Sequence, residues 1–260
     1  MKFMVAVDCE GVACVVGRPA EALGSSNQME FARRQATREA NAVAQALLDS
    51  GAERVVVWDN HGGGVNLEYC ELDPRVDIAL GVGNEHRWPG LTEGFSGVCL
   101  IGYHPMDSTA DGVLAHTFSS ATYQWIEING AQAGEMEIDA AMAGRFGVPV
   151  IMVASDRKGC EEAGRFMPWI ETVETKVGFG WNGCVSKHPL RVLDELAENA
   201  KKAVQSISRM EVFRFEMPAV VRIRYKRLES AQQACVHAPW KREEDPYVVK
   251  RTIQSMGEMW

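Results

Sequence analysis

Three short apolar runs in the first 104 residues of the chain are each followed within three residues by an acidic residue or a histidine that could bind a metal. The pairs are residues 3 to 7 with Asp8, residues 54 to 58 with His61, and residues 98 to 103 with His104. Each run has the length and the apolar or β-branched content of a buried strand. We therefore expect polar side chains at the ends of three central strands.

Helix-forming segments separate these runs. Residues 29 to 48 are rich in good helix formers and carry apolar residues near the helical period, and residues 134 to 146 are also predicted to be helical. Residues 112 to 118, 123 to 128 and 148 to 153 are predicted to be further strands. This alternation favours an α/β fold with a mostly parallel sheet flanked by helices.

The C-terminal part has a more mixed pattern. A long helix is predicted at residues 189 to 206, and the sequence is strand-like at residues 211 to 225. We expect an α/β domain over residues 1 to 155 and a smaller α+β domain over residues 156 to 260.

The composition narrows the possible partners. The 260 residues include 27 Lys and Arg against 35 Asp and Glu, and the resulting net charge of -8 does not favour nucleic acid or an anionic membrane as a partner. No stretch approaches the roughly 18 apolar residues of a membrane span, and the first apolar run is too short for a signal peptide, so we expect a cytoplasmic protein. The seven cysteines include no Cys-x-x-Cys pair, which argues against a disulfide framework or a thiolate zinc site.

The strand ends carry the residue types of a metal site. In open α/β sheets, ligand sites form beyond the carboxyl ends of the strands, so Asp8, His61 and His104 can converge. Side chains alternate along an extended backbone, so Asp8 and Glu10 can face one site while Cys9 faces away. Imidazole and carboxylate together suit zinc, and a carboxylate can bridge two ions, for which Asp8 is the natural candidate.

The same residues could instead have purely structural roles. The acids could form ordinary turn or salt-bridge contacts, and the histidines could be held by backbone hydrogen bonds. Glu135 and Glu137 begin a predicted helix, where the helix dipole favours acidic residues whatever their function. His116 lies inside a predicted apolar strand, where it could be a buried, hydrogen-bonded histidine. The remaining histidines, expected in loops or at the surface, are His86, His188 and His237.

Five ordered motifs point to one family. They are VDCEG at residues 7 to 11, DNHGG at 59 to 63, IGYHPM at 101 to 106, GVLAHTFSS at 112 to 120 and NGAQAGE at 129 to 135. With these motifs the chain resembles the zinc-dependent D-aminopeptidases typified by the enzyme of the bacterial dipeptide-transport operon. The resemblance covers about residues 1 to 190, and five blocks in order are far more specific than any one of them.

The resemblance implies a set of site residues. The family's ligands to two zinc ions correspond to Asp8, Glu10, His61, His104 and Glu135, and its catalytic histidine corresponds to His116. The resemblance also implies a metal-binding α/β domain, a smaller second domain and a ring-shaped homo-oligomer, with a decamer as the family's assembly.

Residues and resemblance together predict a zinc-dependent aminopeptidase that hydrolyses short peptides, with an N-terminal D-amino acid as the expected substrate. The two metals would polarise the scissile carbonyl and lower the pKa of a bound water. One alternative is a dinuclear metal hydrolase that acts on another amide or on a phosphate ester. Another is a non-catalytic oligomeric metal-binding protein.

Overall fold

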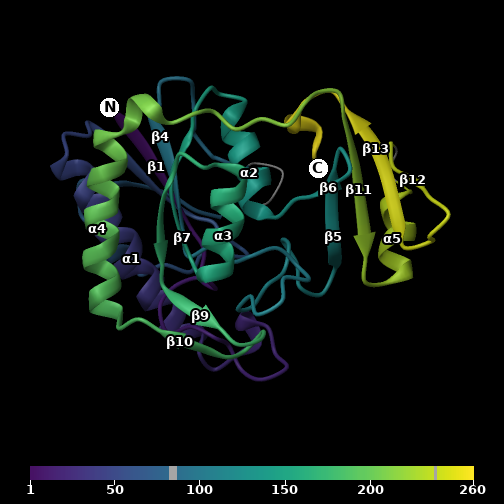
Figure 1. Ribbon diagram of the computed structural model, residues 1–260, viewed down its shortest axis with the longest axis horizontal. Coiled ribbons are helices and arrows are strands. Elements are labelled where there is room, and N and C mark those ends of the chain that lie inside the picture. Colours follow the sequence, from purple (N-terminus) through teal and green to yellow (C-terminus); the bar gives the residue numbers. More distant parts are fainter. Residues whose placement is uncertain (82–86, 237–238) are drawn as a thin grey trace.

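The computed structural model describes residues 1 to 81, 87 to 236 and 239 to 260, and it contains a larger and a smaller β-sheet (Figure 1). The larger sheet and its helices form the main body, and the smaller sheet lies to one side of it. Of the histidines expected in loops or at the surface, His188 is exposed just before a helix. His86 and His237 lie outside the described residues.

The larger sheet is parallel throughout its described strands. In spatial order these are β3 (Asp77–Ala79), β2 (Arg54–Asp59), β1 (Lys2–Val7), β4 (Gly97–Ile101), β7 (Val150–Ser155) and β8 (Glu171–Glu174). The predicted α/β class with a mostly parallel sheet is confirmed.

Helices cover both faces of this sheet (Figure 1). One face carries α1 (Met29–Asp49) and α4 (Pro189–Gln205), and the other carries α2 (Glu135–Gly144) and α3 (Arg157–Phe166). Phe3 and Val5 of β1 belong to the hydrophobic cluster that includes α1 and α4, whereas Met4 and Ala6 belong to the cluster that includes α2. Because both faces are buried, the strands are continuously apolar rather than alternating.

The smaller sheet is antiparallel. In spatial order its strands are β12 (Lys241–Arg242), β13 (Val248–Ile253), β11 (Ala219–Tyr225), β5 (Tyr123–Ile128) and β6 (Ala131–Gln132), with α5 (Leu228–Ala234) packed against it. Ile126 and Ile223 join the same hydrophobic cluster as α2. The smaller sheet therefore packs on the α2 side of the main body.

A separate hairpin pairs β9 (Lys176–Gly178) with β10 (Cys184–Ser186). Short 3-10 helices lie at η1 (Leu23–Ser25), η2 (Tyr69–Glu71), η4 (Ile207–Arg209) and η5 (Met256–Glu258). No helix in the three described ranges is long and apolar enough to cross a membrane.

The domain boundary near residue 155 stays a prediction. The division of the chain between the two sheets does not coincide with it. β8 and α4 lie after this position but pack with the larger sheet, while β5 lies before it but pairs in the smaller one.

The strand predicted at residues 112 to 118 is wrong. This segment is a loop in which Leu114 and Phe118 have φ values of 53° and 57°. Positive φ angles are incompatible with an extended strand, and the apolar composition of the segment reflects burial of a loop. His116 is therefore a loop residue.

Candidate metal centre

Three neighbouring strands of the larger sheet bring the predicted residues together. Because β2, β1 and β4 are adjacent and parallel, their carboxyl ends lie at one edge of the sheet. Asp8 directly follows β1, His61 follows β2 by two residues and His104 follows β4 by three. The predicted convergence of these strand ends is confirmed.

The first half of the cluster joins Asp8, Glu10 and His61. The His61 Nδ1 atom lies 2.7 Å from Asp8 Oδ1 and 3.0 Å from Glu10 Oε2. Cys9, between the two acids, is buried in the hydrophobic cluster on the α1 and α4 side. Both acids thus face the site while Cys9 faces away, as expected, although β1 ends at Val7 and the backbone at Cys9 and Glu10 is a bend and a turn rather than an extended strand.

The second half joins His104 and Glu135 to Asp8. His104 Nε2 lies 3.1 Å from Glu135 Oε1 and 3.5 Å from Asp8 Oδ2. Asp8 therefore presents one carboxylate oxygen to His61 and the other to His104, which is the arrangement that a bridging carboxylate needs.

Glu135 reaches the cluster as the first residue of α2. The Glu137 carboxylate accepts the Gly134 backbone N–H at 2.8 Å, which fixes this first turn. An acidic residue at a helix start is common for reasons of the helix dipole alone, so only the family resemblance could single out Glu135.

His116 lies against the second half of the cluster. Its ring stacks on the ring of His104 with centroids 3.8 Å apart, and its Nε2 atom lies 3.9 Å from Glu135 Oε1. Its Nδ1 atom lies 2.8 Å from the Leu114 carbonyl oxygen. A carbonyl only accepts, so Nδ1 carries the proton and Nε2 of the neutral ring holds a lone pair.

The acids give the cluster an affinity for positive charge. Burial lowers the pKa of His104, but Glu135, Asp8 and Glu10 outweigh burial and raise it to about 10. Burial also lowers the pKa of His61, which Glu10 and Asp8 nevertheless raise well above its ordinary value. A site that holds protons this firmly on its imidazoles is one in which a metal cation can replace those protons.

The pKa of His116 shifts in the opposite direction. Burial and the charge of the neighbouring His104 lower the pKa of His116. A neutral imidazole at pH 7 can accept a proton, so the cluster combines two cation-favouring histidines with one histidine suited to act as a base.

Two observations show that these side chains fit a metal. Glu10 Oε2 and His104 Nε2 are buried. They lie 3.0 Å from His61 Nδ1 and 3.1 Å from Glu135 Oε1, respectively, but among the described residues neither makes a contact with hydrogen-bond geometry, which is costly unless another group satisfies them. Two sets of donor atoms also lie within 4.8 Å of one another, namely His104, His116 and Glu135, and Asp8, Glu10 and His104. This nitrogen and oxygen donor set suits zinc.

Asp59, which was not among the predicted site residues, holds the loop that carries His61. Its buried carboxylate accepts hydrogen bonds from the backbone N–H groups of Asn66 and Leu67 and from the Tyr69 hydroxyl group. Asn66 Nδ2 in turn donates to the His61 carbonyl oxygen at 2.5 Å. Two signals in the sequence could have found it, because Asp59 is an acidic residue at the end of an apolar strand and is also the first residue of the DNHGG motif.

A second supporting network fixes α2 relative to β4. Asp139, one turn after Glu135, accepts a hydrogen bond from the Tyr103 hydroxyl group at 2.6 Å and pairs with Arg87. Tyr103 precedes His104 directly. This network therefore holds two candidate ligands at a fixed spacing, and its members are too far apart in the sequence to be recognised there.

Comparisons with known proteins identify the family of this chain. A protein-family model described as D-aminopeptidase matches residues 1–260. The chain belongs to the D-aminopeptidase family. It is 30% identical over 209 residues to a D-aminopeptidase of Bacillus subtilis (strain 168), and this alignment covers 79% of the chain and 74% of the relative.

A solved structure is similar over nearly the whole chain. It is the Zn-dependent D-aminopeptidase DppA from Bacillus subtilis, described as a self-compartmentalizing protease. The TM-score is 0.92 at 26% sequence identity, with 99% of this chain and 93% of that chain covered. The predicted family is therefore confirmed, and the chain is a hydrolase that acts on peptide bonds.

Proposed function

We propose that this chain is a zinc-dependent aminopeptidase that removes the N-terminal residue, a D-amino acid, from short peptides. The observation that carries the proposal is the convergence of five donor side chains from three strand ends and the start of α2. They are Asp8, Glu10, His61, His104 and Glu135.

These donors would divide between two zinc ions. Asp8, Glu10 and His61 would hold one zinc ion, and His104 and Glu135 would hold the second together with the other oxygen of Asp8. The division follows the two oxygens of Asp8, which face different histidines. When bound, the ions polarise the scissile carbonyl and make a bound water more acidic.

His116 is the catalytic residue in this proposal. Its Nδ1–H group is engaged by the Leu114 carbonyl oxygen, so the ring is held in one tautomer with Nε2 directed toward Glu135. The lowered pKa of His116 keeps Nε2 free to accept a proton near neutral pH.

The His116→Ala substitution tests this assignment. We expect the variant to retain zinc and to lose peptidase activity by about 10²-fold or more, the usual contribution of a positioned acid or base. Zinc per chain and hydrolysis of a matched pair of D-alanyl and L-alanyl dipeptides are measured in both proteins. His188→Asn, at an exposed histidine, is the control.

Each result bears on a different part of the proposal. Normal turnover by His116→Ala would remove its catalytic role, and loss of zinc would make His116 a ligand. Faster cleavage of the L-alanyl peptide would reject the D-amino acid preference. Wild-type protein that holds no metal, with no activity restored by zinc, would reject the whole proposal.

We also propose that the chain assembles into a ring-shaped homo-oligomer, a decamer, and that it works in the cytoplasm. The similar solved structure is described as self-compartmentalizing, which supports an assembly that encloses its sites. The seven cysteines are free thiols, as expected for a reducing compartment. Light scattering on the purified protein gives the subunit number, and cell fractionation gives the location.

A further inference from the structure

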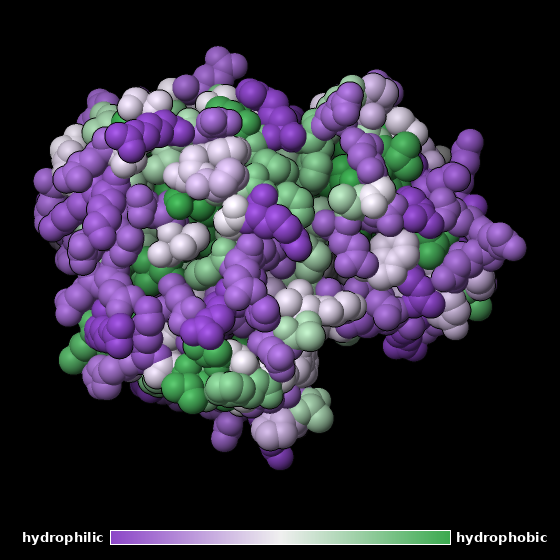
Figure 2. All heavy atoms as spheres, viewed as in Figure 1, coloured by the Kyte–Doolittle hydropathy of each residue, from purple (hydrophilic) through white to green (hydrophobic). Residues whose placement is uncertain are grey.

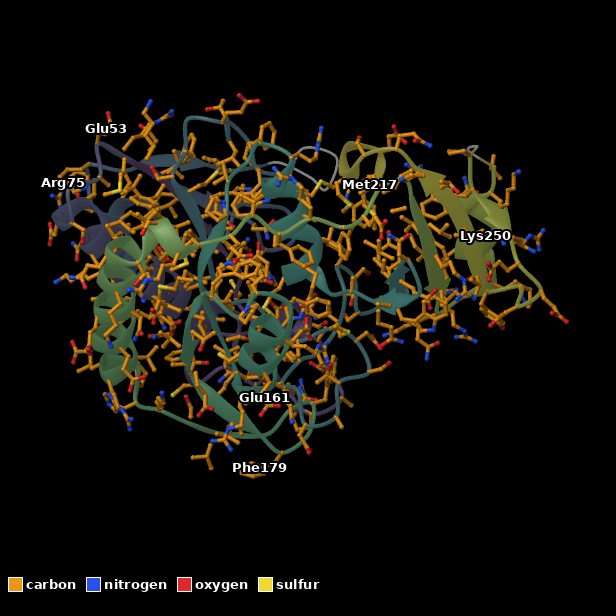
Figure 3. The ribbon with its side chains drawn as sticks, turned by 45° about the horizontal axis from the view of Figure 1, so that its top comes forward. Glu53, Arg75, Glu161, Phe179, Met217 and Lys250 are labelled. Carbon is orange, nitrogen blue, oxygen red and sulfur yellow. The ribbon has the colours of Figure 1, made fainter. Side chains whose placement is uncertain are left out.

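The β9–β10 hairpin, residues 176 to 186, has no part in the proposed mechanism, yet it contacts two of the loops that carry site residues. The hairpin lies at the lower edge of the molecule, where Figure 2 shows hydrophobic atoms gathered. Figure 3 places Phe179 of its tip at the outer edge, and this side chain is 69% exposed. The base of the hairpin is buried instead, and there the contacts are made.

Lys176, at the base, holds the loop that follows β1. Its side chain is 1% exposed, and its Nζ atom donates to three backbone carbonyl oxygens: Glu10 at 2.5 Å, Val12 at 2.8 Å and Val15 at 2.6 Å. A buried ammonium group is stable only when its donors are satisfied. Three carbonyls of one short loop therefore have to point at a single atom, and one of them belongs to a candidate ligand.

Neighbours of Lys176 strengthen the same attachment. The Thr175 hydroxyl group donates to the Gly11 carbonyl oxygen at 2.6 Å, and Ser186 Oγ accepts the Cys14 backbone N–H at 2.8 Å. Asn182 Nδ2 donates to the Val16 carbonyl oxygen at 2.8 Å. The hairpin region thus contacts the loop from residue 10 to residue 16.

Trp181, in the turn of the hairpin, holds the loop that carries His116. Its backbone carbonyl accepts the Leu114 N–H at 2.8 Å, and its indole Nε1–H donates to the Ala115 carbonyl oxygen at 2.9 Å. The Leu114 carbonyl, on the other side of the same residue, is the acceptor for His116 Nδ1. Leu114 has a φ of 53°, a conformation that a leucine adopts only when its surroundings hold it there.

We propose that the β9–β10 hairpin is the positioning element of the catalytic centre. Lys176 sets the loop that carries Glu10, Trp181 sets the tautomer and direction of His116, and one rigid hairpin thereby fixes the base relative to the metal ligands. Groups that orient ligands in this way typically change metal affinity or activity by 10- to 100-fold when they are removed. The inference rests on the proposed function.

The Trp181→Phe variant tests the contact between the hairpin and the loop that carries His116. It keeps an aromatic ring and the backbone carbonyl but removes the indole N–H donor. With zinc loaded, we expect kcat to fall by about 10-fold while KM, zinc content and Tm stay unchanged, because only the orientation of His116 is affected. Phe179→Leu, at the exposed tip, is the matched control and keeps wild-type kcat. An unchanged kcat in Trp181→Phe, or a fall in KM, zinc content or Tm along with kcat, overturns the role of Trp181.

The Lys176→Met variant tests the first contact through zinc affinity, measured by competition with a chelating dye and without any peptide. Removing a positive charge beside an acidic cluster would by itself strengthen binding of a dication. If Lys176 instead positions the loop that carries Glu10, its removal should weaken zinc binding by about 10-fold or more. Lys158→Met, at an exposed lysine of α3, is the control. Equal or tighter zinc binding by Lys176→Met overturns the role of Lys176.

The two readouts separate failure of this inference from failure of the proposed function. If zinc-loaded wild-type protein cleaves no peptide, the proposed function fails, while the dye competition still tests Lys176. If wild type is active and both variants match it, the hairpin has no positioning role and the proposed function stands. If Lys176→Met does not fold, Trp181→Phe decides the inference.

Discussion

At the scale of single residues, Glu39 of α1 carries a carboxyl group beneath the loop that follows β1. It is fully buried and accepts hydrogen bonds from the Ala13 N–H at 2.9 Å and from Gln35 Nε2 at 2.8 Å. Burial, only partly offset by these hydrogen bonds and by the charge of Lys176, raises its pKa from 4.5 to about 7. The folded protein therefore binds a proton here that the unfolded chain releases between these two pH values.

This difference gives stability a defined pH dependence. Because the folded state holds more protons, the contribution of Glu39 to the free energy of unfolding is greatest below pH 4.5 and is lost as the pH rises to about 7. Glu39→Gln keeps the acceptor oxygen without the charge. We expect the variant to gain up to about 3 kcal/mol relative to wild type between pH 5 and pH 8, measured by urea unfolding. Glu30→Gln, at an exposed position of α1, should show no such gain.

Other residues show where prediction from sequence stops. Asp8, His61 and His104 could be placed because a buried parallel strand is a continuous apolar run and its end is visible in the sequence. Lys176 could not, because its partners lie more than 160 positions away and nothing local marks a lysine for burial. Glu135 needed the family resemblance, since physics alone gives a simpler reason for an acid at a helix start.

At the scale of elements, the loop after β2 depends on a strand end rather than on its own sequence. Residues 60 to 67 contain three consecutive glycines, which have little preference for any one backbone conformation. Asp59 fixes the conformation of this loop, because its carboxylate accepts hydrogen bonds from Asn66, Leu67 and Tyr69. The strand thus shapes the loop that presents His61.

The Asp59→Asn substitution should therefore destabilise the protein, although asparagine has nearly the same shape as aspartate. The amide replaces one acceptor oxygen with a donor that faces other donors, and a buried unsatisfied group costs about 1–3 kcal/mol. We expect a loss of this size in the free energy of unfolding by urea, together with weaker zinc binding. Asp77→Asn is the control, since its ion pair with Arg54 is exposed and should contribute under about 1 kcal/mol. Equal losses in the two variants would contradict the role given to Asp59.

The loop at residues 112 to 118 shows how an element can be mistaken from its composition. Val113 and Leu114 are buried as thoroughly as strand residues, so the segment has a strand's apolar content. The φ angles of Leu114 and Phe118 depend on partners elsewhere in the fold, among them Trp181 and Glu135. Sequence periodicity carries no information about such angles.

At the scale of the whole molecule, the candidate metal centre draws its residues from both sheets. Asp8, His61 and His104 follow strands of the larger sheet, whereas Glu135 follows β6 of the smaller sheet by three residues. A ligand set that exists only in the folded chain makes metal binding a contribution to folding.

Removal of zinc should lower the stability of the entire protein. At a free zinc concentration 100 times the dissociation constant, binding contributes about 3 kcal/mol. We expect the Tm to fall on chelation and to recover when zinc is added back, as followed by calorimetry. His61→Ala should show a smaller zinc-dependent rise than wild type. A Tm that is identical with and without chelator would contradict this coupling.

The short connection between β6 and Glu135 also limits how this chain can vary in length. One inserted residue extends a backbone by about 3.3–3.6 Å, which exceeds the 3.1 Å between His104 Nε2 and Glu135 Oε1. Residues 133 and 134 therefore form a spacer of fixed length. Insertions should be tolerated in exposed turns such as Glu93 and Gly94, but a single added residue in this spacer would displace a carboxylate by a full contact distance.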